Sequence, residues 1–211
     1  MTIYQYVFVA GFFIFLLSGL FIIYKQIRAG AQKDYSHPLG KIGPAVFYSF
    51  TGGMSPRKKE SAYLHLPTYI AGILYHIGTF IAFTYIVTLF FNIDTIPLLK
   101  NTVFFLLVVT GLCGVSILLK RTFKLKLRHL SNPDDYISNL MVTGFQFLMA
   151  LTFFQNTLLS YLFIYAAVLL LYIPISKLRH SIYFFISRIH LGMFCGWRGV
   201  WPLKKQGGSL P

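Results

Sequence analysis

The stretch LPTYIAGILYHIGTFIAFTYIVTLFF, residues 66–91, contains no Lys, Arg, Asp or Glu and a single histidine, His76. About 20 consecutive, mostly apolar residues are enough to cross a bilayer as an α-helix. Pro67 stands in the first turn of this helix, where its missing N–H breaks no hydrogen bond. The stretch therefore predicts a membrane-spanning helix that carries a histidine at membrane depth.

The whole chain has the composition of a membrane protein. Its 211 residues are 56% hydrophobic and 11% charged, whereas soluble domains carry about a quarter charged residues. So small a polar surface cannot coat a globule in water, but lipid requires no polar coat. The net charge of +14 does not indicate nucleic-acid binding, because the basic residues cluster between the apolar runs.

Five apolar segments predict an all-α integral membrane protein with five transmembrane helices. The predicted helices cover residues 4–27, 66–91, 96–119, 136–154 and 157–186. The last helix is long, and Pro174 is expected to kink it. We expect residues 1–190 to form this five-helix domain and residues 191–211 to form a cytoplasmic tail.

Lysine and arginine are distributed unequally between the two ends of the predicted helices. All but one of the 19 basic residues fall in the first connection, the third connection or the C-terminal end, and the exception is Lys100. The positive-inside rule then predicts an N-terminus outside and a cytoplasmic C-terminus.

Two histidines, His76 and His180, are predicted to lie at membrane depth, where an ionisable group is costly and indicates function. At 1.5 Å per residue, His76 lies roughly 13–15 Å from the start of its helix. His180 lies near the inner end of a helix that runs the opposite way, so both residues fall in the cytoplasmic half. Two imidazoles facing each other at matched depth predict the axial ligands of one haem b on the inner side.

Neighbouring residues suit such a group. Gly72, one turn before His76, has no side chain and would let a flat macrocycle approach the backbone. Lys177 and Arg179 would pair with haem propionates near the interface. Two alternatives stay open: His76 hydrogen-bonds a neighbouring helix, and His180 is one more basic residue at the interface.

The other four histidines are assigned ordinary roles. His37, His129 and His190 are expected to be solvated loop residues. His65 precedes His76 by about three helical turns and shares its face. We interpret His65 as a polar residue at the helix end, with contact to the haem edge or a second cofactor as the alternative.

Two motifs carry a resemblance to a known family. HIG, residues 76–78, and PISKLRH, residues 174–180, resemble motifs of the gamma-subunit family of respiratory nitrate reductase. MSPRKKE, residues 54–60, resembles the branch containing cytochrome b subunits of heterodisulfide-reductase-like and sulfite-reduction complexes. The resemblance covers most of residues 1–190. It implies five helices, an outside N-terminus, haem ligands at His76 and His180, and a multi-pass protein of a bacterial or archaeal cytoplasmic membrane.

The chain departs from this family at the outer haem. Nitrate-reductase gamma subunits hold a second haem, whose ligands would fall at Ile86 and Leu162. Met149 is the one remaining candidate for an outer ligand, and its expected role is core packing. We therefore expect a single inner haem, a quinone that reacts near it, and little charge movement across the membrane.

The leading hypothesis is a membrane-anchor cytochrome b subunit that passes electrons between a quinone and a cytoplasmic iron–sulfur subunit of the heterodisulfide-reductase-like type. The two cysteines form no iron–sulfur motif, so a partner must hold the clusters. The basic loops and residues 192–211, with Trp197 and Trp201, are predicted to dock this partner, but interfacial tryptophan also anchors proteins to lipid.

Two other function classes stay open. A haem-free structural anchor is favoured by the missing outer ligands. A small transporter is disfavoured, because all five acidic residues are expected in loops and no predicted helix is broken by paired Gly and Pro at mid-membrane.

Overall fold

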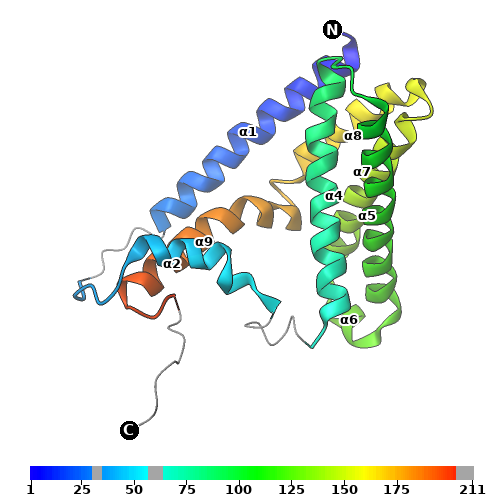
Figure 1. The fold of residues 1–211 in the computed structure, drawn as a ribbon. Helices are drawn as coiled ribbons and strands as arrows, with labels where there is room; N and C mark the ends of the chain where they lie inside the picture. Colours follow the sequence, from blue (N-terminus) through cyan, green and yellow to red (C-terminus); the bar gives the residue numbers. More distant parts are fainter. Residues whose placement is uncertain (30–34, 57–63, 203–211) are drawn as a thin grey trace. The chain divides into compact units, whose positions relative to one another are not determined.

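The computed structural model describes residues 1–29, 35–56 and 64–202, and every regular element in them is helical (Figure 1). These elements are α1 (Ile3–Ala29), α2 (Ile42–Phe50), η1 (Gly52–Met54), α4 (Leu66–Phe90), α5 (Pro97–Phe123), α6 (Leu125–His129), α7 (Pro133–Thr152), η3 (Asn156–Leu158), α8 (Leu159–Tyr172), η4 (Lys177–Arg179) and α9 (His180–Trp197).

The chain divides into two compact units. Unit 1 contains Met1–Ser18 and Pro67–Arg179, and unit 2 contains the described residues of Gly19–Leu66 and His180–Pro211. Helix α1 therefore contributes its first half to unit 1 and its second half to unit 2.

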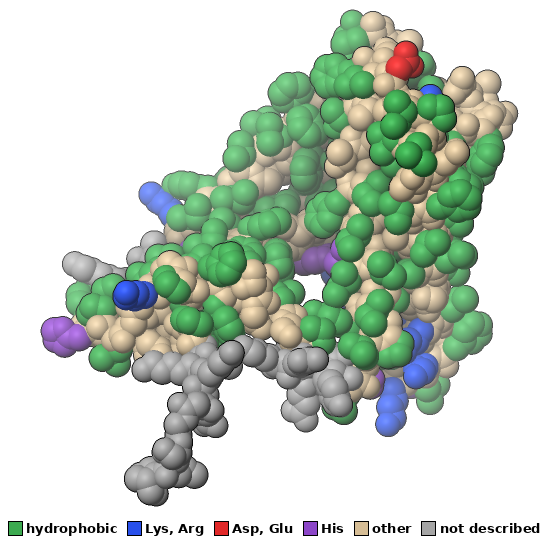
Figure 2. Space-filling model, in the orientation of Figure 1, with side chains coloured by type: hydrophobic (Ala, Val, Ile, Leu, Met, Phe, Trp, Pro, Cys, Tyr) green, Lys and Arg blue, Asp and Glu red, His purple; other side chains and the backbone are tan. Residues whose placement is uncertain are grey.

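Within the described residues, three helices, α1, α4 and α5, are long and apolar enough to span a membrane. A fourth candidate exists if the segments Asn156–Tyr172 and Lys177–Trp197 cross as one broken span. Figure 2 shows apolar side chains over much of the visible face of unit 1, with Lys and Arg gathered at the end that carries α6. The chain thus has the helix lengths and hydropathy of a multi-pass membrane protein.

The predicted helix over residues 157–186 is interrupted, which corrects the expectation of a kink alone. The α-helix stops at Tyr172 and resumes at His180. Pro174 has no N–H to continue the helical hydrogen bonds. Ser176 Oγ instead accepts a hydrogen bond from the Leu178 N–H at 3.1 Å, as an N-cap does at a new helix start.

Helix α7 corresponds to the predicted segment 136–154 but begins earlier. Asn132 caps it through a reciprocal pair of hydrogen bonds with Asp135, and Pro133 occupies the first turn. Several of its polar side chains, including Ser138, Thr143 and Gln146, are buried within unit 1 together with apolar ones such as Phe145, whereas Leu140 is exposed. The polar residues inside explain why α7 is less apolar than the three candidate spans.

The core of unit 1 depends on close helix approaches. A Cβ added at Gly78 of α4 would lie 1.9 Å from Thr110 Oγ1 of α5. A Cβ added at Gly114 of α5 would lie 2.4 Å from both Thr143 Oγ1 and the Tyr75 ring. Small residues at such positions let membrane helices approach closely.

Unit 2 is built on the packing of α2 against α9. A Cβ added at Gly192 would lie 2.5 Å from the Val46 Cα, and one at Gly196 would lie 2.9 Å from the Ile42 Cα. Helix α9 extends to Trp197, so residues 191–197 are helical, whereas the sequence analysis places them in a tail.

Candidate functional site

His76 lies on an exposed face of α4 in unit 1. Its ring is stacked near that of Tyr75, with centroids 6.3 Å apart. Ile77 and Phe80 on this side are 45% and 61% exposed. A Cβ added at Gly72 would find no atom within 4 Å. Within unit 1, His76 is therefore the one imidazole on an open, apolar helix surface, among the residues described.

The adjacent face of α4 is hydrogen-bonded to the side-chain amide of Gln146 in α7, which is fully buried. Its Nε2 donates to the Tyr75 carbonyl oxygen at 3.1 Å and to Thr79 Oγ1 at 2.8 Å. Its Oε1 accepts a hydrogen bond from Thr110 Oγ1 at 2.8 Å. One side chain thus joins three helices, and every donor or acceptor that it buries has a partner.

Tyr75 extends this hydrogen-bond network. Its hydroxyl donates to the Asn139 carbonyl oxygen at 2.9 Å and lies 2.9 Å from Thr143 Oγ1. Both partners belong to α7. Hydrogen bonds with α7 therefore fix the rotation of the α4 turn that carries His76, and Thr110 of α5 in turn holds Gln146.

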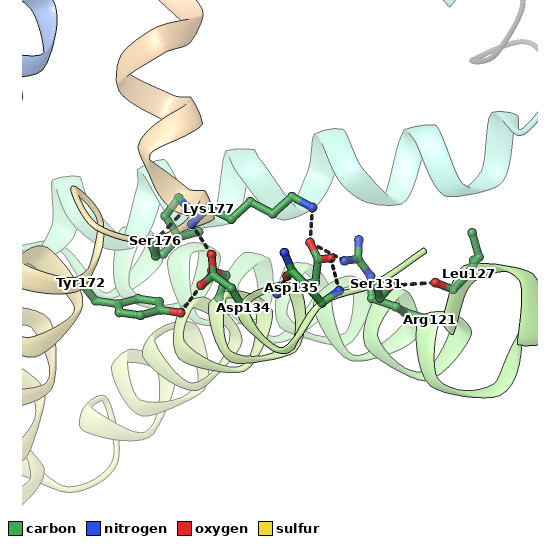
Figure 3. Close-up of polar contacts among 11 residues, drawn as sticks. Arg121, Leu127, Ser131, Asp134, Asp135, Tyr172, Ser176 and Lys177 are labelled. Carbon is green, nitrogen blue, oxygen red and sulfur yellow. Dashed lines mark hydrogen bonds and ion pairs between the residues drawn. The ribbon is translucent and has the colours of Figure 1, made fainter. Parts of the chain in front are cut away.

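A second polar cluster lies at the start of α7 (Figure 3). The Asp135 side chain is 3% exposed and forms ion pairs with Arg121, at 2.7 Å, and with Lys177. Asp134 Oδ2 accepts a hydrogen bond from the Lys177 backbone N–H at 2.6 Å, and Asp134 Oδ1 accepts one from the Tyr172 hydroxyl. The cluster joins α5, α7 and the segment that follows α8.

Both carboxylates in this cluster have lowered pKa values. Burial alone raises the pKa of Asp135, but hydrogen bonds from Lys177, from the Asn132 N–H and from Arg121 outweigh it and lower that pKa to about 2. The hydrogen bond from Tyr172 is the largest cause that lowers the pKa of Asp134. Both groups are therefore ionised at neutral pH. A buried acid at this position is contrary to the expectation that all acidic residues lie in loops.

The residues predicted to hold a haem are divided between the two units. His76 and Gly72 belong to unit 1, as do Lys177 and Arg179 of η4, and His180 begins α9 in unit 2. The predicted pairing of His76 with His180 stays a prediction, because each unit is described by itself. Lys177, one of the two predicted propionate partners, is paired with Asp135, and Arg179 and His180 are exposed.

The three positions considered for an outer haem are apolar core of unit 1. Ile86 is 1% exposed, and Leu162 and Met149 are fully buried. Core packing, the role expected for Met149, agrees with this burial. Across residues 1–29, 35–56 and 64–202, no group of three or more His, Cys, Asp or Glu is arranged to hold a metal ion.

The remaining histidines differ in part from expectation. His37 is exposed and outside any helix, and His65 is exposed in the turn before α4. His129 and His190 lie in α6 and α9, so the prediction that both are loop residues is wrong. Most of the motif at residues 54–60, from position 57 onward, lies outside the described residues.

Sequence reasoning missed the Gln146 network. A signal was present: Asn139, Thr143 and Gln146 recur at helical spacing within an apolar stretch, which indicates a polar stripe that faces other helices.

No protein-family model, curated protein or solved structure matches this chain. The resemblance carried by residues 76–78 and 174–180 therefore stays an expectation drawn from the sequence.

Proposed function

We propose that this chain is the membrane-anchor cytochrome b subunit of a respiratory-type complex in a bacterial or archaeal cytoplasmic membrane. It passes electrons between a membrane quinone and a cytoplasmic iron–sulfur partner through one haem b on the inner side. The observation that carries the proposal is the surface around His76. There an imidazole stands on an open apolar face of a spanning helix, with unoccupied space at Gly72.

The chemistry of the predicted residues suits this group. His76 and His180 would supply the two imidazole nitrogens, and Gly72 would leave room for the edge of a macrocycle. Arg179 would carry a positive charge toward a propionate. Lys177 would do so only in competition with its ion pair to Asp135. The bound group would supply one-electron chemistry at iron, while the chain would supply ligands and charge.

The proposed topology has five spans, an outside N-terminus and a cytoplasmic C-terminus. The charge distribution supports it through the positive-inside rule. Residues 136–154, most of which belong to α7, would form the fourth span, since their exposed members include the apolar Ile137, Leu140 and Leu151, at 48%, 61% and 53%. Residues 157–186, which include α8 and the first turns of α9, would form the fifth span, and the rest of α9 would lie at the interface.

A haem-free structural anchor is the second candidate, and one observation favours it. In unit 1 the buried polar groups around Gln146 hydrogen-bond to one another. Ile86 and Leu162, the positions where the ligands of an outer haem would fall, are packed in the apolar core. Such a bundle needs no cofactor to hold its helices together.

The electron-transfer claim is tested in proteoliposomes that contain the purified chain, a short-chain quinol and a soluble electron acceptor. We expect quinol oxidation that depends on His76 and produces little membrane potential, read with a potential-sensitive dye. A large potential would contradict a single inner haem, because charge would then cross the bilayer. No quinol oxidation by a haem-loaded chain would contradict the quinone-linked role.

A further inference from the structure

The described residues of unit 2 include four contacts in which a basic side chain lies over an aromatic ring, and in each the two residues are four positions apart. The distances from the cationic atom to the ring centroid are 4.7 Å for Lys25–Phe21, 5.1 Å for Arg28–Tyr24, 5.6 Å for Arg188–Phe184 and 3.8 Å for Arg198–Phe194. Residues four apart on a helix share one face. The pattern thus places a cation directly beside an aromatic ring on α1 and at α9.

Most of these rings are exposed. Phe21, Tyr24 and Phe194 are 58%, 53% and 55% exposed. Basic side chains that lie along apolar surface with the charged head beyond it are typical of the membrane interface. In water alone these exposed rings would be costly, whereas at the head-group level both the ring and the cation are satisfied.

The charge of unit 2 has one sign in the residues described. Its segments 19–29, 35–56, 64–66 and 180–202 contain five Lys or Arg and neither Asp nor Glu. A surface whose charge is positive complements an anionic surface.

The pair of α2 and α9 has the form of an interfacial element. The two helices bury small residues against each other, including Ala45 and Gly196. Bulky apolar side chains point elsewhere, with Phe47 and Phe185 71% and 55% exposed. Trp197 is tied to the segment before α2 by a 2.9 Å hydrogen bond from its Nε1–H to the Ser36 carbonyl oxygen. Amphipathic helices with basic and aromatic residues lie in the plane of the interface.

We propose that unit 2 is a binding surface for anionic phospholipid head groups of the cytoplasmic leaflet. Its exposed basic side chains, Lys25, Arg28 and Lys41, contact lipid phosphates, and its exposed aromatic and aliphatic side chains enter the acyl boundary. An acidic protein would suit the charges equally well, but not the exposed rings beside them. This surface is independent of haem, so a haem-free anchor would bind the same lipids.

The chain carries its own probe for this surface. Its only two tryptophans, Trp197 and Trp201, both belong to unit 2. The full chain is reconstituted in phosphatidylcholine vesicles with 30% phosphatidylglycerol. Bromine, which quenches tryptophan fluorescence, is attached to the acyl chains of one lipid in one sample and of the other lipid in a second sample, at the same mole fraction of brominated lipid. We expect brominated phosphatidylglycerol to quench the tryptophans severalfold more than brominated phosphatidylcholine. High salt should reduce this ratio.

The test variant is Lys25→Gln/Arg28→Gln, which removes the two paired charges whose side chains are exposed. Each basic group near an anionic surface strengthens the attraction roughly fivefold, so the quenching ratio should fall to about one. Lys25→Arg/Arg28→Lys keeps the charge and should keep the ratio, which guards against misfolding as the cause. The matched control is Lys124→Gln/Lys126→Gln, which removes two exposed charges in unit 1.

Three outcomes would overturn the proposal. The first is equal quenching by the two brominated lipids in the wild type. The second is an equal loss in the Lys124→Gln/Lys126→Gln control, which would mean that total charge alone attracts the lipid. The third is quenching by aqueous acrylamide and by neither lipid, which would mean that the surface faces water and suits a soluble partner.

Discussion

Gln146 Nε2 of α7 donates a 3.1 Å hydrogen bond to the carbonyl oxygen of Tyr75, the residue directly before His76. That carbonyl also accepts a bond from Thr79 Oγ1 at 2.8 Å, so the turn of α4 that carries His76 is held from within and from α7. The hydrogen bonds set the rotation of α4, and this rotation leaves the imidazole exposed. A buried polar contact thus determines which way the candidate ligand faces.

Replacing Gln146 by Leu is predicted to destabilise unit 1. The change removes three hydrogen bonds and leaves Thr110 and Thr79 each without one partner inside the bundle. Hydrogen bonds between membrane helices average about 0.6 kcal/mol each, so the expected loss is about 2 kcal/mol. Reversible unfolding in mixed micelles measures it. Gln155→Leu is the matched control, because Gln155 is exposed after the end of α7, and equal stability of the two variants would refute the role given to Gln146.

Two glycines of α4 are predicted to respond in opposite directions to alanine. Gly78→Ala brings a Cβ to 1.9 Å from Thr110 Oγ1, and overpacking of this kind costs about 1–3 kcal/mol. Gly72→Ala meets no atom within 4 Å and should stabilise the helix by up to about 1 kcal/mol. The same unfolding assay compares the two. A harmless Gly78→Ala would show that α4 and α5 do not approach as closely as described.

The Asp135 cluster predicts loss of stability in acid. The pKa of Asp135 is lowered from 3.8 to about 2 in the folded protein. Its ion pairs therefore stabilise the fold above pH ~4, and this contribution is lost as the pH falls toward 2. We expect it to be on the order of 1 kcal/mol, because the exposed Lys177 is screened by solvent.

The variant Asp135→Asn separates this effect from general acid unfolding. At neutral pH it should be less stable than the wild type, and the difference should shrink as the pH falls through the window from 4 to 2. Unfolding curves at several pH values measure the difference. A difference that does not change with pH would show that the carboxylate charge of Asp135 is not what stabilises the cluster.

Composition and apolar run length were enough to predict the helices that position His76. Residues 66–91 predict α4 almost to its ends, because an unbroken apolar run is a strong signal. The break after Tyr172 was predicted only as a kink. The full interruption of the helix is held by two hydrogen bonds, from the Leu178 N–H to Ser176 Oγ and from the Lys177 N–H to Asp134 Oδ2. Asp134 lies 43 residues from Lys177 in the chain, so the sequence gives no local sign of this second bond.

The candidate site was predictable only in its residue types. The position of His76 in a helix follows from the sequence, but its exposed orientation depends on Gln146 and Thr110, which lie in two other helices. Lys177 was likewise predicted to pair with a haem propionate, because nothing in the nearby sequence indicates that its partner is Asp135. Long-range pairing of this kind leaves no local pattern.

The most direct test of the central claim is the reduced-minus-oxidised absorption spectrum of the purified chain. We predict a b-type spectrum at one haem per chain, absent in His76→Ala and in His180→Ala and retained in His190→Ala, with all variants folded by circular dichroism. No b-type band, or a band that survives both His76→Ala and His180→Ala, would contradict the account.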